Sequence, residues 1–231
     1  MFQNIKVIGF DADDTLWINE PFFQNVEKKF CRIVKAYLSE SDASKELFKT
    51  EMQNLEIYGY GAKGFILSMV ETSVRISDGK ISAEEINQII DAGKTLLTMP
   101  IELLDGVEKV LQMLQGKYKL ILATKGDLLD QERKLKESGL FGYFHHIEVM
   151  SDKRESNYQK LLDHLDIEPE QFLMVGNSVK SDILPVTNIG GKAIHIPYEI
   201  TWQHENHHAP VKSDVYITLS SITEILEHLL K

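Results

Sequence analysis

The stretch that decides the fold is GFDADDTLW, residues 9–17. The apolar run IKVIGF (residues 5–10) overlaps its start and predicts a buried β-strand. The carboxylates Asp11, Asp13 and Asp14 stand where this strand ends. Ligands bind beyond the carboxyl ends of parallel strands, and clustered like charges cost stability unless a cation or hydrogen bonds compensate them. The stretch therefore predicts a Mg²⁺ site that also provides an aspartate nucleophile; the alternative is a solvated acidic turn.

Composition limits the classes of partner. The formal net charge of -10 argues against nucleic acid or an anionic membrane, because both need a basic protein face. The single cysteine, Cys31, excludes an internal disulfide and fits a reducing compartment. No apolar run reaches the ~18 residues of a membrane span, and the first residues lack the layout of a signal peptide. We therefore expect a cytoplasmic protein, as a monomer or homodimer.

Apolar periodicity predicts two kinds of region. Residues 20–98 show helical spacing throughout, and the capping-box pattern Ser82-Ala83-Glu84-Glu85 opens their last helix. From residue 99, strands alternate with helices, which implies a doubly wound, Rossmann-like parallel sheet. We predict an α/β catalytic core of residues 1–19 and 99–231, with 20–98 as an inserted helical cap. After the first strand, helices are expected at about 21–38, 44–58, 65–76, 82–98, 107–114, 127–139, 155–165, 181–188 and 220–230, and strands at 120–123, 147–149, 172–175, 193–196 and 214–219.

Polar side chains end or closely follow four of the predicted strands. They are Asp11 with Asp13, Thr124, Lys153, and Asn177 with Asp182. In a parallel sheet these groups converge on one edge. A carboxylate there can attack phosphorus, and a second acid can protonate the leaving oxygen and then activate water. A hydroxyl and an ammonium can hold phosphoryl oxygens while Mg²⁺ neutralises charge, so the set suits phosphoryl transfer.

This pattern resembles the haloacid dehalogenase (HAD) superfamily with a helical cap of the first type, over essentially the whole chain. The family's first motif, Asp-x-Asp-x-Thr, is matched by residues 11–15. Its second, a Ser or Thr that ends a strand, is matched by Thr124. Its third, a lysine, is matched by Lys153, with Lys160 as the alternative. Its fourth, an acidic motif after a strand, is matched by GNSVKSD, residues 176–182.

The resemblance implies a role for each matched residue. Asp11 would be the nucleophile and Asp13 the general acid/base, which also gives its backbone carbonyl to Mg²⁺. Thr124 and Lys153 would bind the phosphoryl group, and Asp182 would ligate Mg²⁺ beside Asp11. The second aspartate resembles phosphatases and phosphomutases and differs from the haloacid dehalogenases themselves.

Four positions depart from the family pattern. Asn177 stands where many relatives have an acid, so the Mg²⁺ site has one negative charge fewer. Either its affinity for the metal is lower, or Asn177 binds the metal directly or through water. Lys125 replaces a common Asn and would add a cation to the phosphate pocket. Asp14 replaces a frequent Gly, and Arg154 replaces a frequent Pro. None of these changes removes a catalytic group.

The resulting prediction is a Mg²⁺-dependent phosphatase that hydrolyses a small phosphorylated metabolite through an aspartyl-phosphate intermediate. The alternatives with related chemistry are a phosphomutase and a dehalogenase-type hydrolase. The alternatives without enzyme activity are a receiver-like signalling protein and a phosphate-binding relative. A receiver domain is much shorter and carries its phosphoacceptor on a later strand.

Two further patterns are weaker. GYGAKG, residues 59–64, matches a dinucleotide fingerprint, but a polar segment precedes it where the fingerprint needs a strand. We interpret it as an inter-helix loop in which Tyr60 and Lys63 are candidate substrate contacts. The group His204, Glu205, His207 and His208 does not have metal-ligand spacing, so a solvated loop is expected.

Overall fold

The computed structural model describes residues 2–205 and 215–230. They divide into two compact units. The first contains Met1–Glu20, Ile101–Lys125 and Gln131–Lys231, and the second contains Pro21–Pro100 with Gly126–Asp130. The first unit holds the β-sheet, and the second is helical.

Within the described residues, the first unit builds a sheet of six parallel strands. The strands are β1 (Val7–Phe10), β2 (Lys119–Lys125), β3 (His146–Met150), β4 (Phe172–Gly176), β5 (Lys192–His195) and β6 (Tyr216–Thr218). Their spatial order is β3-β2-β1-β4-β5-β6, so the chain builds outward from β1 to β3 and then restarts on the other side of β1 at β4. Ligands bind at the carboxyl ends of strands where the order reverses in this way. The acidic stretch directly follows β1, so the topology places it at that point.

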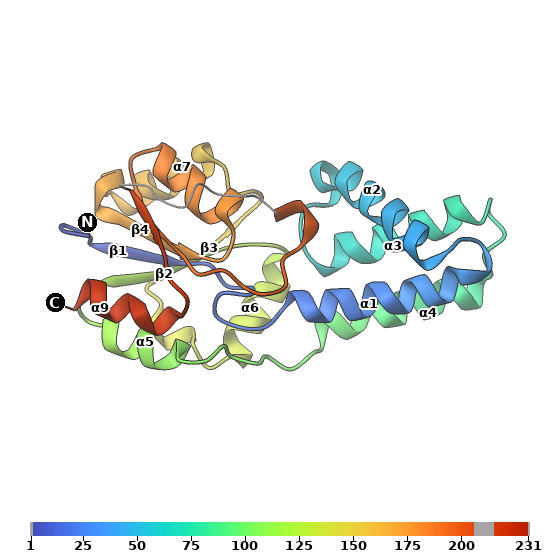
Figure 1. Ribbon diagram of the computed structural model, residues 1–231, viewed down its shortest axis with the longest axis horizontal. Coiled ribbons are helices and arrows are strands. Elements are labelled where there is room, and N and C mark those ends of the chain that lie inside the picture. Colours follow the sequence, from blue (N-terminus) through green and yellow to red (C-terminus); the bar gives the residue numbers. More distant parts are fainter. Residues whose placement is uncertain (1, 206–214, 231) are drawn as a thin grey trace. The chain divides into compact units, whose positions relative to one another are not determined.

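Helices cover both faces of the sheet (Figure 1). Side chains alternate between the two faces along each strand. Ile8 and Phe10 of β1 belong to a core shared with α5 (Val107–Leu114) and α9 (Ile225–Leu229). Val7 belongs to the opposite core, shared with α7 (Glu155–Leu165) and α8 (Leu184–Asn188). This is the doubly wound parallel sheet that the sequence predicts.

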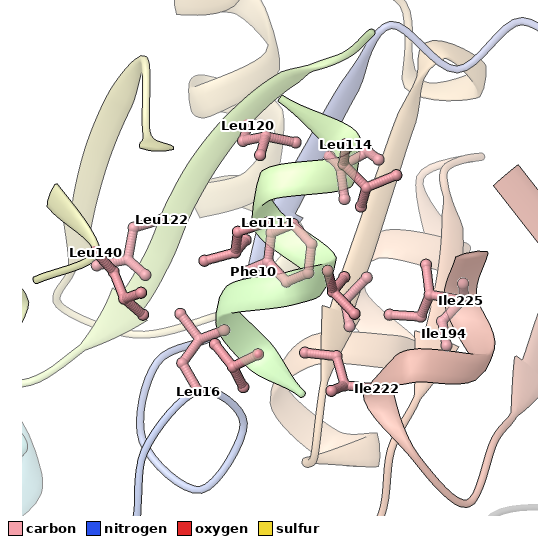
Figure 2. Close-up of a cluster of buried hydrophobic side chains, with 14 of the residues drawn as sticks. Phe10, Leu16, Leu111, Leu114, Leu120, Leu122, Leu140, Ile194, Ile222 and Ile225 are labelled. Atoms are coloured by element: carbon pink, nitrogen blue, oxygen red, sulfur yellow. The ribbon is translucent and has the colours of Figure 1, made fainter. Parts of the chain in front are cut away.

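The core on the α5 side holds the acidic stretch in place. Figure 2 shows Phe10 of β1 against Leu111 of α5, with Leu120 and Leu122 of β2 nearby. Leu16 and Trp17, which follow the three acids, are also fully buried. Burying one large apolar side chain contributes about 1.5–3 kcal/mol. The carboxylates therefore lie on a short segment fixed on both sides by the core.

The helical unit has its own apolar core. Its helices are α1 (Glu20–Ile33), α2 (Glu40–Tyr58), α3 (Ala62–Ile76) and α4 (Ala83–Lys94). Phe30, Leu47, Met69 and Ile89, one from each helix, are fully buried in a common cluster. Ser82 and Glu85 form the capping box that opens α4, as predicted. The unit can therefore bury a sizeable apolar surface of its own.

Several predicted helices differ in detail from the observed ones. Those expected at 21–38 and 82–98 end as 3₁₀ turns at Val34–Ala36 and Thr95–Leu97. The helix expected at 181–188 begins instead as a wider turn with π-helical spacing, Val179–Ile183, before α8. The reason is Pro185, which has no N–H to donate to the Ser181 carbonyl as an α-helix requires. That carbonyl accepts a hydrogen bond from the Tyr158 hydroxyl at 3.1 Å.

The GYGAKG segment joins α2 to α3. Because a helix precedes it, the dinucleotide fingerprint lacks its structural context, and the inter-helix interpretation is confirmed. Gly59 and Gly61 have φ of 71° and 106°, values that favour glycine. In the described part of the chain, no helix combines the length and apolar character needed to span a membrane.

Candidate active site

Lys153 joins the carboxylate of the predicted nucleophile, Asp11, to that of a predicted metal ligand, Asp182. Its Nζ lies 2.5 Å from Asp11 Oδ1 and 2.6 Å from Asp182 Oδ1. Asp11 follows β1, Asp182 follows the neighbouring β4, and Lys153 stands between β3 and α7. The side chains of Lys153 and Asp182 are each 1% exposed, and that of Asp11 is 10% exposed. Three segments that are distant in sequence thus meet in one buried ionic cluster.

The charges of this cluster are strongly coupled. Burial raises the pKa of Asp11 to about 7; Lys153 opposes the shift, and the Asp182 charge adds to it. Burial acts to lower the pKa of Lys153, but the two carboxylates outweigh it and hold that pKa well above its ordinary value. Lys153 is therefore a cation at neutral pH. A second cation beside Asp11 would favour its ionised, nucleophilic form.

Thr15 connects the first and fourth motifs. Its hydroxyl donates to Asp11 Oδ2 at 3.0 Å, and the Asn177 backbone N–H donates to the same hydroxyl oxygen at 3.1 Å. The Asn177 side-chain oxygen lies 3.4 Å from the Thr15 hydroxyl. These contacts hold the loop after β4 next to Asp11, the predicted nucleophile, and place Asn177 at the same edge of the sheet.

Asp182 is held by its own loop. The Ser178 N–H donates to Asp182 Oδ2 at 3.0 Å, and the Ser178 hydroxyl accepts from the Ser181 N–H at 3.0 Å. At Gly176, a β-carbon would lie 2.2 Å from Asp182 Oδ2. Only glycine leaves room for the carboxylate to approach the end of β4 so closely.

The donor set fits Mg²⁺, which prefers carboxylate, carbonyl and amide oxygens. Asp11 and Asp182 supply carboxylates, and Asn177 supplies an amide oxygen at the same edge. No group of three or more His, Cys, Asp or Glu side chains in residues 2–205 and 215–230 could hold a metal by itself. A Mg²⁺ site here would therefore combine two carboxylates with carbonyl or amide oxygens and water.

Asp13, two residues after Asp11, is bound by groups that lie outside the predicted motifs. Its Oδ1 accepts from Trp17 Nε1 at 2.7 Å and from Lys134 Nζ at 3.0 Å. Its Oδ2 accepts from Gln131 Nε2 at 2.9 Å. Gln131 and Lys134 lie three residues apart on α6 (Leu128–Glu137). Both oxygens of the predicted acid/base residue are thus held by defined donors.

Asp14 fixes the end of the acidic stretch. Its φ of 59° lies in the left-handed region, which explains why glycine suits this position. Its carboxylate accepts from the backbone N–H groups of Asn19 at 2.8 Å and Glu20 at 3.0 Å. Burial raises its pKa to about 8, and these hydrogen bonds act against the shift. Asp14 therefore adopts a strained backbone conformation, and its carboxylate caps the start of α1.

The two residues at the end of β2 have different surroundings. The Thr124 hydroxyl, 1% exposed, donates to the Lys125 carbonyl at 3.2 Å. Lys125 Nζ lies 2.5 Å from Glu205 Oε1 and 2.9 Å from the Ser181 hydroxyl. That Thr124 and Lys125 bind phosphate stays a prediction. Lys160 is exposed on α7, so the geometry favours Lys153 as the third-motif lysine.

Tyr60 and Lys63 belong to the helical unit. Lys63 Nζ makes an ion pair with Asp127 at 2.9 Å, within the same unit. Their expected contact with substrate stays a prediction.

Glu205 contradicts the expected solvated loop. Its carboxylate is 12% exposed, and besides Lys125 it accepts from the hydroxyls of Ser178 and Ser181. Burial acts to raise its pKa, but Lys125 and the hydroxyl donors outweigh it and lower that pKa to about 2. The loop prediction is wrong at Glu205 because these donors compensate a buried charge. His207 and His208 lie outside the described residues.

Glu205→Gln is expected to destabilise the fold by about 1–3 kcal/mol at pH 7. The folded pKa of Glu205 lies below its unfolded value of 4.5, so its contribution is present above pH 4.5 and is lost as pH falls toward 2. Urea unfolding at pH 7 and pH 3 measures the difference, with the exposed Glu199→Gln as control. An equal loss at both pH values, or none, would contradict the ion pair.

Sequence reasoning missed Trp17, Gln131, Lys134 and Glu205. The spacing of Gln131 and Lys134 is a signal that they share a helix face. Nothing in the local sequence, however, shows that this face meets Asp13. The partners of Glu205 include Lys125, Ser178 and Ser181, which are separated from it in the sequence by at least one helix and one strand.

The family comparison agrees with the fold. The model of the haloacid dehalogenase-like hydrolases matches residues 5–190, which include every predicted catalytic and metal-binding residue. The chain belongs to this family of hydrolases.

Individual relatives support the same class. A crystal structure of a haloacid dehalogenase-like family hydrolase from Xanthomonas campestris is 35% identical, with a TM-score of 0.87 over 98% of this chain and 92% of that one. A glyceraldehyde 3-phosphate phosphatase from Methanothermobacter thermautotrophicus is 25% identical over 96% of this chain and 100% of its own. The human N-acylneuraminate-9-phosphatase is 28% identical over 53% of this chain and 50% of its own.

Proposed function

We propose that the protein is a Mg²⁺-dependent phosphatase that acts on a small phosphorylated metabolite. The observation that carries this proposal is the buried cluster in which Lys153 binds both Asp11 and Asp182, with Asp13 two residues after the nucleophile. The phosphatase names of the two curated relatives support the same reaction class. Their substrates differ, so the metabolite itself is left to experiment.

The reaction would run in two steps on the side chains of this unit. The Asp11 carboxylate forms a bond to phosphorus while the bond to the leaving oxygen breaks, and Asp13 passes a proton to that oxygen. Asp13 then takes a proton from a water molecule that attacks phosphorus. The bond between phosphorus and Asp11 breaks, and inorganic phosphate leaves with the carboxylate restored.

The remaining residues would bind and orient the phosphoryl group. Lys153, Thr124 and Lys125 supply an ammonium, a hydroxyl and a second ammonium. Asp11, the Asp13 carbonyl, Asp182 and Asn177 would hold Mg²⁺. When bound, the ion supplies charge neutralisation at the phosphoryl oxygens. Residues 20–98 would act as a cap that excludes water and, through Tyr60 and Lys63, contacts the substrate.

Asp13 is the residue that favours a phosphatase over a haloalkanoate hydrolase. Carbon–halogen cleavage releases a halide that needs no proton, whereas an alkoxide leaving group does. A phosphomutase would use the same residues but return the phosphoryl group to a sugar. No contact in the described units favours retransfer over hydrolysis.

Phosphate release from a panel of small phosphate esters and an aryl phosphate tests the proposal. It would be measured with Mg²⁺ and with a chelator, for the wild type, Asp11→Asn and Asp13→Asn. Mg²⁺-dependent release that Asp11→Asn abolishes and that Asp13→Asn reduces strongly, to a measurable residual rate, is the expected result. If the folded, Mg²⁺-loaded wild type released phosphate from no ester, the phosphatase proposal would be wrong.

Gly176→Ala is expected to raise the Mg²⁺ concentration for half-maximal rate by about 10-fold or more, because the new methyl group displaces Asp182. A Mg²⁺ titration of the initial rate measures the effect. Gly142→Ala is the matched control, since a β-carbon there meets no atom within 4 Å. Equal Mg²⁺ dependence of the two variants would show that the position of Asp182 does not limit metal binding.

A further inference from the structure

We propose that Lys134, with Gln131, is a positioning residue for Asp13 that sets where the acid/base carboxylate points. The inference rests on the proposed phosphatase function. It adds two residues of α6 that no catalytic motif of the sequence contains.

The first observation is that both carboxylate oxygens of Asp13 accept hydrogen bonds from defined donors. Lys134 and Trp17 hold one carboxylate oxygen, and Gln131 holds the other. The Asp13 side chain is 24% exposed, so it can still meet a substrate. The carboxylate is therefore fixed on the side of α6 and open to solvent elsewhere.

The second observation is the burial of Lys134. Its side chain is 2% exposed, and removing an ammonium group from water is costly unless partners compensate it. The contacts that compensate it include Asp13 and the side-chain oxygen of Asn19, at 3.0 and 2.8 Å. Lys136, two residues further along the same helix, is exposed. The burial of Lys134 is thus explained by its contact with Asp13 and Asn19 and not by the composition of α6.

The third observation concerns Gln131, a buried polar residue that also contacts Asp13. Its Nε2 donates to Asp13 and, at 3.1 Å, to the Lys125 carbonyl, while its buried Oε1 has no hydrogen-bond partner among the residues that the structure describes. Leaving a buried acceptor unsatisfied costs about 1–3 kcal/mol. The Gln131 amide is therefore held in the orientation in which its N–H groups bind Asp13 and the Lys125 carbonyl of β2, although this orientation leaves its oxygen unsatisfied.

These contacts predict which reaction step depends on Lys134. When the phosphorus–oxygen bond breaks, an alkoxide leaving group needs the proton from Asp13, whereas a weakly basic phenolate leaves without it. A carboxylate displaced by about 1 Å can lose about 100-fold in rate. Loss of Lys134 should therefore slow the cleavage of alkyl phosphates and spare that of activated aryl phosphates.

The experiment compares kcat/KM for an alkyl phosphate that the wild type hydrolyses with kcat/KM for 2,4-dinitrophenyl phosphate. For Lys134→Met we expect a loss of about 100-fold with the alkyl ester and less than about 3-fold with the aryl ester. Lys134→Arg should recover part of the alkyl activity because it keeps the charge. Lys136→Met, on the exposed side of α6, is the matched control.

A double-mutant cycle with Asp13→Asn tests whether Lys134 acts through Asp13. In that background, Lys134→Met should cause no further loss. Equal losses with the two esters, or a full-sized loss in the Asp13→Asn background, would overturn the inference while leaving the phosphatase proposal intact. If the wild type hydrolysed neither ester, the proposed function would fail first.

A folding defect would be detected by circular dichroism and gel filtration. If Lys134→Met did not fold, Gln131→Met would replace it, since that variant removes the donor to Asp13 and keeps Lys134. It should show the same selectivity between esters at about 10-fold. Equal effects on both esters would then overturn the inference.

Discussion

Asp11→Asn is expected to lower phosphate release by about 10⁴-fold or more, with the fold retained. An amide cannot form the acyl phosphate, and the hydrogen bonds from Thr15 and Lys153 place this one carboxylate in the centre of the ionic cluster. Initial rates with an aryl phosphate measure the loss. Asp166→Asn is the matched control, because Asp166 is exposed and asparagine tolerates its left-handed backbone.

The same substitution should change the pH dependence of stability. The folded pKa of Asp11 is about 7 against 3.8 for the unfolded chain, so the folded state binds the extra proton between these values. Its contribution to stability therefore declines as pH rises from about 4 to 7. In Asp11→Asn this decline in stability should disappear, which urea unfolding across that pH range would detect.

An Asp11→Asn variant with near wild-type phosphatase activity would contradict the assignment of Asp11 as the nucleophile.

Lys153→Met has the second largest expected effect, a loss of activity of about 10³-fold together with a loss of stability. The substitution leaves the Asp11 and Asp182 carboxylates buried without their shared ammonium partner. Breaking such a pair costs about 3–5 kcal/mol. Without Lys153 the folded pKa of Asp11 should move further above its unfolded value, so the stability loss should grow as pH rises.

Urea unfolding of Lys153→Met at pH 5.5 and pH 8 measures that trend, with initial rates measured in parallel. The control is Lys160→Met, in which the other candidate lysine of the same region is removed from an exposed site. Equal stability of Lys153→Met and the wild type at pH 8 would contradict the buried cluster. If Lys160→Met lowered activity more than Lys153→Met did, Lys160 would be the lysine of the third motif.

Much of the fold could be predicted from the sequence because the apolar runs are short and well separated. The strand at 172–175 and the helix at 155–165 agree with β4 and α7. Their order along the chain implies a parallel sheet, and the parallel sheet brings the polar residues after β1 and β4 together. The start of α2 was placed four residues late, although Ser39, whose side chain accepts from the Asp42 N–H, is a cap visible in the sequence.

The parts of the site that sequence missed depend on tertiary contacts. Lys134 stands in a polar helical segment whose pattern is typical of a solvated face, and its contacts with Asp13 and Asn19, both distant in sequence, compensate its burial. Glu205 lies three short elements after β4, and its stabilisation depends on Lys125 from β2. A charge that is buried because of a distant partner leaves no periodic signal in its own neighbourhood.

The most direct test of the central claim is to trap the covalent intermediate. Asp13→Asn, in which release of the intermediate should be slow, would be mixed with 2,4-dinitrophenyl phosphate and Mg²⁺, quenched in acid and digested for mass spectrometry. We expect one alkali-labile phosphoryl group on the peptide that contains Asp11, and none in the Asp11→Asn, Asp13→Asn double variant. Phosphate turnover without any such adduct, or an adduct on another residue, would contradict it.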